Sequence, residues 1–158
     1  MRNDPGLLPK TLAVVRIAIA CFFLLFGQYK LFSPEFAHGG FAQYLQSYVQ
    51  GSAVALYQPI LGDLVLPHAA FFGYLIGAVE FAIGICLLLG IAVRPASVAG
   101  ALHMISLTLA TWWSPGHGVP IWRYFGAELD HISLLFLFVL FFVGDAGKQW
   151  GLDGRRKT

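Results

Sequence analysis

Residues 69–91 read AAFFGYLIGAVEFAIGICLLLGI, an apolar run in which Glu80 is the only charged residue. At about 1.5 Å per residue, a helix of this length crosses a hydrocarbon core of ~30 Å. Three more apolar runs lie at 11–32, 95–113 and 125–144, and the run at 95–113 is the shortest of the four. The sequence therefore predicts an all-α fold, an integral membrane four-helix bundle. A carboxylate inside such a bundle is costly unless it is protonated, paired or facing water, which makes Glu80 the first candidate functional residue.

The composition is that of a membrane protein. Apolar residues make up 58% of the chain and charged residues 11%, and the mean hydropathy is +0.71, outside the usual range of soluble globular proteins. The four runs, one connector at 33–67, short turns and two short tails use up the length of the chain, which predicts a single membrane domain over 1–158. The net charge of +2 comes without a basic cluster on a soluble face, so we expect a lipid membrane and no nucleic acid as partner.

Basic residues are distributed unevenly between the two ends of the predicted bundle. In a four-span chain, both tails and the turn near residue 94 lie on one side. That side carries most of the positive charge: Arg2, Lys10, Arg94, Lys148, Arg155, Arg156 and Lys157. Only Lys30 and Arg123 lie near the opposite loops, so the positive-inside rule places both termini in the cytoplasm. The run at 11–32 is longer than the core of a secretory signal peptide, and we expect it to be a retained span.

The connector at 33–67 is too long for a simple turn and too apolar for a solvated loop. Within it, apolar residues of 52–64 fall at helical spacing on one face: Ala53, Leu56, Tyr57, Ile60, Leu61 and Leu64. The preceding stretch has a similar set: Phe41, Tyr44, Leu45 and Tyr48. We predict one or two amphipathic helices folded over the outer mouth of the bundle, with tyrosines at the membrane interface. A lid over a ligand pocket is a second interpretation, compatible with the first.

Polar side chains within the runs fall at different predicted depths. Counted from the cytoplasmic end at about 1.5 Å per residue, Arg16 comes first, and Glu80 and His103 follow toward the middle. His131 lies slightly further out, and the rest cluster near the outer boundary: Gln28, Lys30, Glu128 and Asp130. Arg16 and Glu80 are the natural pair for charge neutralisation, although Arg16 can instead extend to the headgroups.

Glu80 and His103 each have a purely structural alternative. Glu80 can be protonated and bonded to Ser106, Thr108 or a backbone carbonyl, and His103 can be a hydrogen-bonded packing residue. A bis-histidine haem with His131 is disfavoured because the depths of the two rings differ by about 5 Å. The histidines also lack metal-ligand spacing, so neither haem nor a metal is favoured.

Small residues within the runs are interpreted as packing residues. Cys21 and Cys86 form no C-x-x-C pair, and their depths differ by about 7 Å, so a dithiol relay is not expected. Gly73, Gly77 and Gly84 indicate close helix packing, with Gly73-x-x-x-Gly77 as the clearest case.

The outer cluster has two interpretations. Lys30 can extend to the interface, or it can place a cation at the mouth of an outer pocket beside Glu128 or Asp130. Glu128 and Asp130 can equally be solvated charges that favour the N-terminal dipole of the last helix.

Several short motifs together resemble the DoxX/DoxD family of small four-span bacterial membrane proteins. They are, in order, Arg16, Gly27-x-x-Lys30-Leu31, Glu80 followed by Gly84, Leu87-Leu88-Leu89-Gly90, Arg94-Pro95-Ala96, and the tail Asp145-Ala146-Gly147-Lys148-Gln149-Trp150-Gly151-Leu152-Asp153. The resemblance implies a location in the bacterial inner (plasma) membrane. Family members include membrane subunits of thiosulfate:quinone oxidoreductase, and others are linked to thiol or oxidative-stress complexes. The resemblance therefore implies a subunit of a quinone-linked oxidoreductase, acting with other protein subunits and with a quinone as cofactor.

Residue roles follow from this expectation. Glu80 and His103 would exchange protons with the quinone, and Arg16 would polarise a carbonyl or tune Glu80, which makes these three the candidate catalytic residues. The candidate cofactor-binding residues are Lys30, Gln28, His131 and Glu128, with Lys30 also placed to attract an anionic donor. The alternative is a non-catalytic structural or assembly subunit of a larger membrane complex, in which the polar residues form interhelical hydrogen bonds. A small transporter or proton path is a third hypothesis, ranked last because four spans are few for that task.

Overall fold

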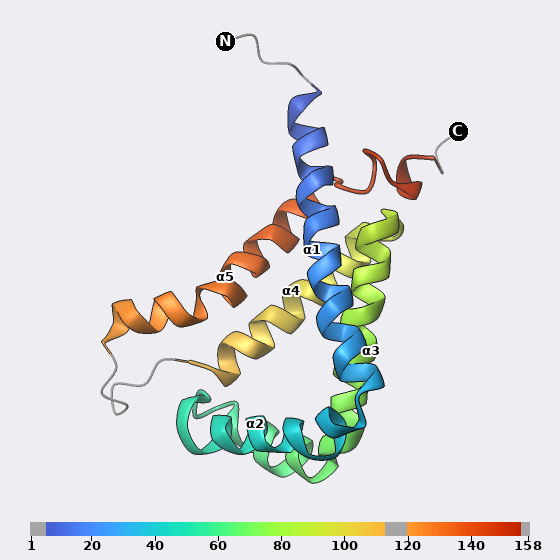
Figure 1. Cartoon of the computed structure of the whole chain (residues 1–158). Coiled ribbons are helices and arrows are strands. Elements are labelled where there is room, and N and C mark those ends of the chain that lie inside the picture. Colours follow the sequence, from blue (N-terminus) through green and yellow to red (C-terminus); the bar gives the residue numbers. More distant parts are fainter. Residues whose placement is uncertain (1–5, 113–119, 156–158) are drawn as a thin grey trace.

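The computed structural model of the chain defines residues 6–112 and 120–155 and, within 121–130, the backbone alone. Every regular element in these ranges is helical, and no strand occurs there (Figure 1). The all-α fold class predicted from the apolar runs is confirmed.

Four long helices occupy the predicted apolar runs: α1 (Leu7–Phe32), α3 (Ala69–Leu89), α4 (Val93–Ala110) and α5 (Ile121–Val143). Among the described residues, two helical segments are long and apolar enough to cross a membrane: α1 and the continuous segment Ile60–Leu89, which includes α3. Of α5, the part whose side chains the structure describes contains a shorter apolar helix, His131–Val143. Membrane crossing by α4 and α5 stays a prediction.

The helices associate in two pairs, α1 with α3 and α4 with α5. Figure 1 shows the α4–α5 pair tilting away from the α1–α3 pair toward the end of the bundle where the connector lies. At the opposite end the four helices converge on a core of apolar side chains: Ile19, Ala20, Phe23, Ile83, Leu87, Val93, Met104, Phe138, Phe141 and Ala146. The bundle is therefore closed by packing at one end and splayed at the other.

Glycines let α1 and α3 approach each other closely. A Cβ on Gly27 would lie 2.5 Å from the backbone nitrogen of Phe81, and a Cβ on Gly77 would lie 2.8 Å from that of Leu31. A Cβ on Gly84 would likewise lie 2.8 Å from the Leu24 side chain on α1, closer than van der Waals contact. The close packing predicted for the glycines of α3 is present, and Gly27 supplies the matching position on α1.

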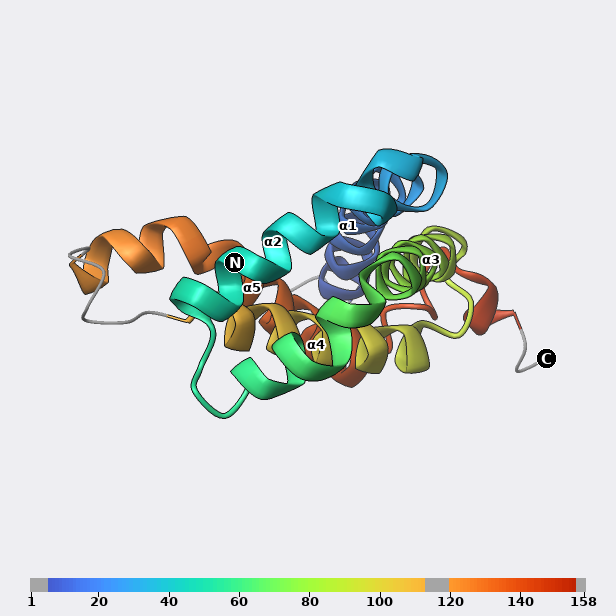
Figure 2. The ribbon, with the colours of Figure 1, turned by 90° about the horizontal axis from the view of Figure 1, so that it is seen from below.

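The connector is a series of short helices across the splayed end, as Figure 2 shows. After α1 come a π-helix at Phe36–Gly40, α2 at Phe41–Ser47 and a second π-helix at Tyr48–Ser52. Beyond a turn, a π-helix at Ile60–Val65 and a 3₁₀ turn at Leu66–His68 lead into α3. The helical connector predicted for 33–67 is thus observed in its first half and at its end.

The single apolar face predicted over 52–64 is wrong. Ala53 is extended, and the backbone N–H of Val54 donates to the carbonyl oxygen of Leu109 at 2.9 Å, which attaches this segment to α4 and interrupts the helix. As a result the predicted face divides: Leu61 is buried, whereas Leu56 is 86% exposed.

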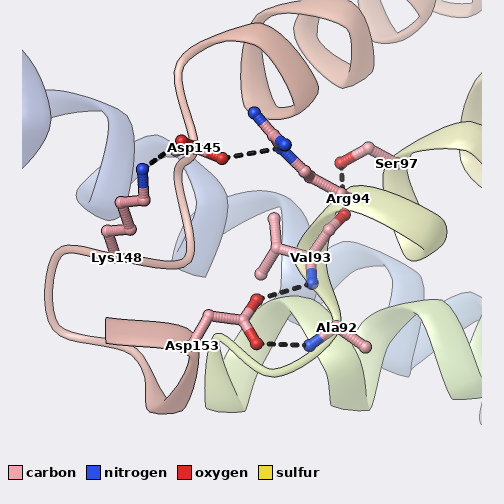
Figure 3. A network of polar contacts seen from close by, with 7 residues as sticks. All are labelled: Ala92, Val93, Arg94, Ser97, Asp145, Lys148 and Asp153. Carbon is pink, nitrogen blue, oxygen red and sulfur yellow. Dashed lines mark hydrogen bonds and ion pairs between the residues drawn. The ribbon is translucent and has the colours of Figure 1, made fainter. Parts of the chain in front are cut away.

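The tail after α5 folds back onto the turn between α3 and α4 (Figure 3). Asp153 accepts hydrogen bonds from the backbone N–H groups of Ala92 and Val93, both at 2.9 Å, and so caps the start of α4. Its own N–H donates to the carbonyl oxygen of Gly90 at 2.8 Å. Arg94 pairs with Asp145 at 2.6 Å, so the turn and the tail are joined by charge as well.

Candidate functional site

Glu80 lies at the centre of a buried polar cluster formed by three helices. It comes from α3, is 4% exposed, and accepts hydrogen bonds at a single oxygen, Oε1. Lys30 of α1 places Nζ 2.6 Å from this oxygen, and His103 of α4 places Nε2 2.7 Å from it. The other oxygen, Oε2, is buried and has no hydrogen-bond partner among the described residues. We call Lys30, Glu80 and His103 the polar triad.

The triad forms because the close glycine contacts bring the last turns of α1 against the middle of α3. Gly27 lies against the backbone of Glu80 and Phe81, and Lys30 follows one turn later on α1. The Lys30 side chain is 21% exposed, and its ammonium lies 5.7 Å from the ring centre of Phe36, within the range of a cation–π contact. The cation therefore has two partners, a carboxylate and an aromatic ring.

A cavity of about 850 Å³ adjoins the triad. Lys30 and His103 form part of its wall, whereas Glu80 lies behind them and does not line it. Helix α1, the connector, α3, α4 and α5 all contribute to the lining, which is rich in aromatic side chains: Phe26, Tyr29, Phe36, Phe41, Tyr44 and Tyr48. The cavity combines a large apolar surface with two polar groups at one point, which is the usual build of a small-molecule site.

Arg16 is not part of this cluster. It is fully buried, and Nη1 donates to the carbonyl oxygen of Leu87 while Nη2 lies 3.4 Å from the carbonyl oxygen of Trp150 in the tail. The expected pairing of Arg16 with Glu80 is therefore wrong. On α1, Arg16 lies about 21 Å along the helix axis from Lys30, which is too far for both to meet the same carboxylate.

The predicted cofactor-binding residues divide into three groups. Lys30 and His131 both line the cavity. Gln28 lies on the exposed face of α1 and is not among the lining residues. The side chain of Glu128 lies outside the described residues, as does that of its neighbour in the outer cluster, Asp130, which was not among the predicted cofactor-binding residues.

Sequence reasoning placed aromatic residues on a helical face of the connector but did not name them as site residues. Phe36 is buried between the connector and α1, and Tyr44 and Tyr48 stack with their ring centres 6.4 Å apart. The helical spacing of the connector aromatics was the available signal, and the interpretation as a lid is the one that this geometry favours. Glu35, which also lines the cavity, had no signal in the sequence.

The DoxX family model matches residues 11–113. The chain belongs to the DoxX family. The match covers α1, the connector, α3 and α4, and with them the whole polar triad. It stops before α5, so His131 and the tail lie beyond it. No curated protein and no solved structure matches this DoxX chain significantly.

Family membership and the two long apolar helices together make this a DoxX-family membrane protein that associates with lipid. The resemblance drawn from the short sequence motifs is thereby confirmed at the level of the family.

Proposed function

We propose that this DoxX protein is the membrane subunit of a quinone-linked oxidoreductase that acts on a sulfur compound or a thiol. The cavity would hold the quinone ring, and a partner subunit would deliver electrons from the sulfur donor. Reduction of the ring takes up two electrons and one proton at each carbonyl oxygen, which yields the quinol.

One observation carries this proposal: an aromatic-walled cavity ends at an ammonium and an imidazole that share one buried carboxylate. The volume of about 850 Å³ lies within the range of roughly 300–1,000 Å³ typical of small-molecule sites. Flat aromatic rings in the wall favour a flat ligand. Lys30 has three N–H donors and uses one on Glu80, so it can donate another to a carbonyl oxygen in the cavity.

His103 links the cavity to Glu80. With Glu80 ionised, Nε2 carries the hydrogen that it donates to Oε1, which leaves Nδ1 as an acceptor. A proton taken up at Nδ1 can therefore be matched by one passed from Nε2 to the carboxylate, and the reverse sequence returns a proton to the cavity. That proton would reside on Oε1, the carboxylate oxygen in contact with Nε2.

The test is the quinone content of the protein purified gently from its native membrane, measured by extraction and mass spectrometry. We expect stoichiometric quinone in the wild type. Leu107→Trp fills the cavity and should remove most of it, because Leu107 lines the wall. Leu102→Trp makes the same change on the same helix at a position that is 63% exposed, and it should leave the content unchanged.

A wild type that carries no quinone but retains a stoichiometric protein partner would refute the proposal and favour the structural or assembly subunit. Equal quinone content in Leu107→Trp and Leu102→Trp would show that the quinone is carried by surrounding lipid and not by the cavity.

A further inference from the structure

The charges at the cavity determine which ligands it can accept. Among the described lining residues, Lys30 is the basic side chain, Glu35 is the acidic one, and His103 and His131 are the histidines. The Lys30 ammonium lies 2.6 Å from the Glu80 carboxylate directly behind the wall. Its charge is therefore already compensated before any ligand arrives.

Glu35 adds a negative charge at the opening. It is exposed and lines the cavity at the junction of α1 and the connector. With the two histidine rings neutral, the described groups at and behind the wall carry a net negative charge. An anion that enters this apolar space loses its hydration and finds no uncompensated cation.

We propose that Glu80 is a specificity determinant that makes the cavity selective for neutral ring ligands and rejects anions of the same shape. This inference rests on the proposed function. It implies that an anionic sulfur donor is oxidised on another subunit and not in this cavity, so Lys30 does not serve as its attractor. A neutral quinone, by contrast, accepts a hydrogen bond from Lys30 without breaking the ion pair.

Two naphthoquinones that differ in one substituent test the inference. 2,3-Dimethyl-1,4-naphthoquinone is neutral, and 2-hydroxy-3-methyl-1,4-naphthoquinone is an anion at mildly alkaline pH. Both have blocked ring positions, so neither adds to the thiols of Cys21 or Cys86. Their dissociation constants would be measured by equilibrium dialysis on detergent-solubilised wild type, Glu80→Gln, Lys30→Gln/Glu80→Gln and Glu35→Gln, with folding of each variant checked by thermal melting.

The wild type should bind the neutral ring with the lower dissociation constant of the two. Glu80→Gln exposes the Lys30 charge to the cavity and should shift the ratio of the two constants toward the anion by roughly tenfold or more, whereas the double variant should return it to the wild-type value. Comparing ratios between variants cancels the different partitioning of the two probes into detergent. Glu35 is exposed, and Glu35→Gln should shift the ratio in the same direction by roughly threefold. This variant replaces Glu80→Gln as the test if Glu80→Gln does not fold.

Suppose that the wild type binds the neutral ring and that Glu80→Gln leaves the ratio of the two dissociation constants unchanged. That result would overturn the inference and leave the proposed function intact. If Glu80→Gln does not fold, an unchanged ratio in Glu35→Gln has the same meaning. A wild type that prefers the anion would overturn the inference too. Failure of the wild type to bind either ring would overturn both the inference and the proposed function.

Discussion

Arg16 on α1 donates a hydrogen bond to the carbonyl oxygen of Leu87 in the last turn of α3. The same guanidinium extends to the tail, where the carbonyl oxygens of Gln149 and Trp150 lie 3.5 and 3.4 Å from Nη2. One buried cation therefore joins the first helix, the end of α3 and the segment after α5. Carbonyl groups at a helix C-terminus carry partial negative charge, which explains why a cation is stable there without a carboxylate in contact.

Arg16→Gln should destabilise the protein without affecting the cavity. The shorter amide cannot reach both α3 and the tail, and we expect a loss of about 2–3 kcal/mol because buried carbonyl groups lose a charged donor. Arg16→Lys should lose less, since it keeps the charge but not the planar fork. Thermal melting in detergent measures the loss, and quinone bound per folded chain should equal the wild type. Normal stability with lost quinone would instead restore Arg16 to the catalytic role predicted from sequence.

Gly27→Ala tests whether the close approach of α1 and α3 positions the triad. The new methyl group would meet the backbone of Phe81 at 2.5 Å, so the helices must separate. We expect a loss of more than about 2 kcal/mol in stability together with weaker quinone binding, because Lys30 moves away from Glu80. Gly39→Ala is the matched control: a Cβ there has no neighbour within 4 Å, and the change should stay within about 0.5 kcal/mol.

Asp153→Ala should weaken the attachment of the tail. It removes the acceptor for the N–H groups of Ala92 and Val93 at the start of α4, and loss of such a cap costs about 1 kcal/mol. Lys148→Gln removes only an exposed partner of Asp145 and should change stability by less than about 0.5 kcal/mol. Proteolysis of the tail would report the difference. Equal resistance of the two variants would mean that the cap contributes nothing.

The connector is held to α4 by the hydroxyl pair of Tyr57 and Ser106, 2.6 Å apart. A double-mutant cycle with Tyr57→Phe and Ser106→Ala should give a coupling energy of about 0.5–1.5 kcal/mol, the net worth of one hydrogen bond. Quinone release should also be faster in each single variant if this contact keeps the connector over the cavity. Additive losses of stability would show that the two hydroxyl groups do not interact.

The apolar runs were sufficient to predict the helices, because burial of backbone polar groups in lipid leaves few other structures for such a chain. The apolar runs were not sufficient to predict which residues pair with Glu80. Residue number gives distances along one helix, but packing decides which level of α1 lies beside Glu80 and in which direction the side chains point. Here Gly27 and Gly77 set that packing, and they turn Lys30 and not Arg16 toward Glu80.

The tail illustrates a second limit. The motifs that contain Arg16, Arg94 and Asp153 were recognised as separate signatures, and the structure places all three at the same end of the bundle. Arg16 and Asp153 bond to distant backbone carbonyl and N–H groups, which carry no side-chain pattern, and Arg94 pairs with Asp145, a residue far away in sequence. The prediction of a single apolar face in the connector was wrong because the hydrogen bond from Val54 to Leu109 is a backbone contact, which the hydrophobic periodicity of the sequence does not reveal.

Photoaffinity labelling with an azidoquinone tests the central claim most directly, because it reports where a quinone lies on this chain. Labelled peptides should come from the cavity wall, residues 26–48 and 103–107, and labelling should fall in Leu107→Trp but not in Leu102→Trp. Labels confined to the exposed outer faces of the helices, and equal in the two variants, would contradict a quinone site at the Lys30–Glu80–His103 triad.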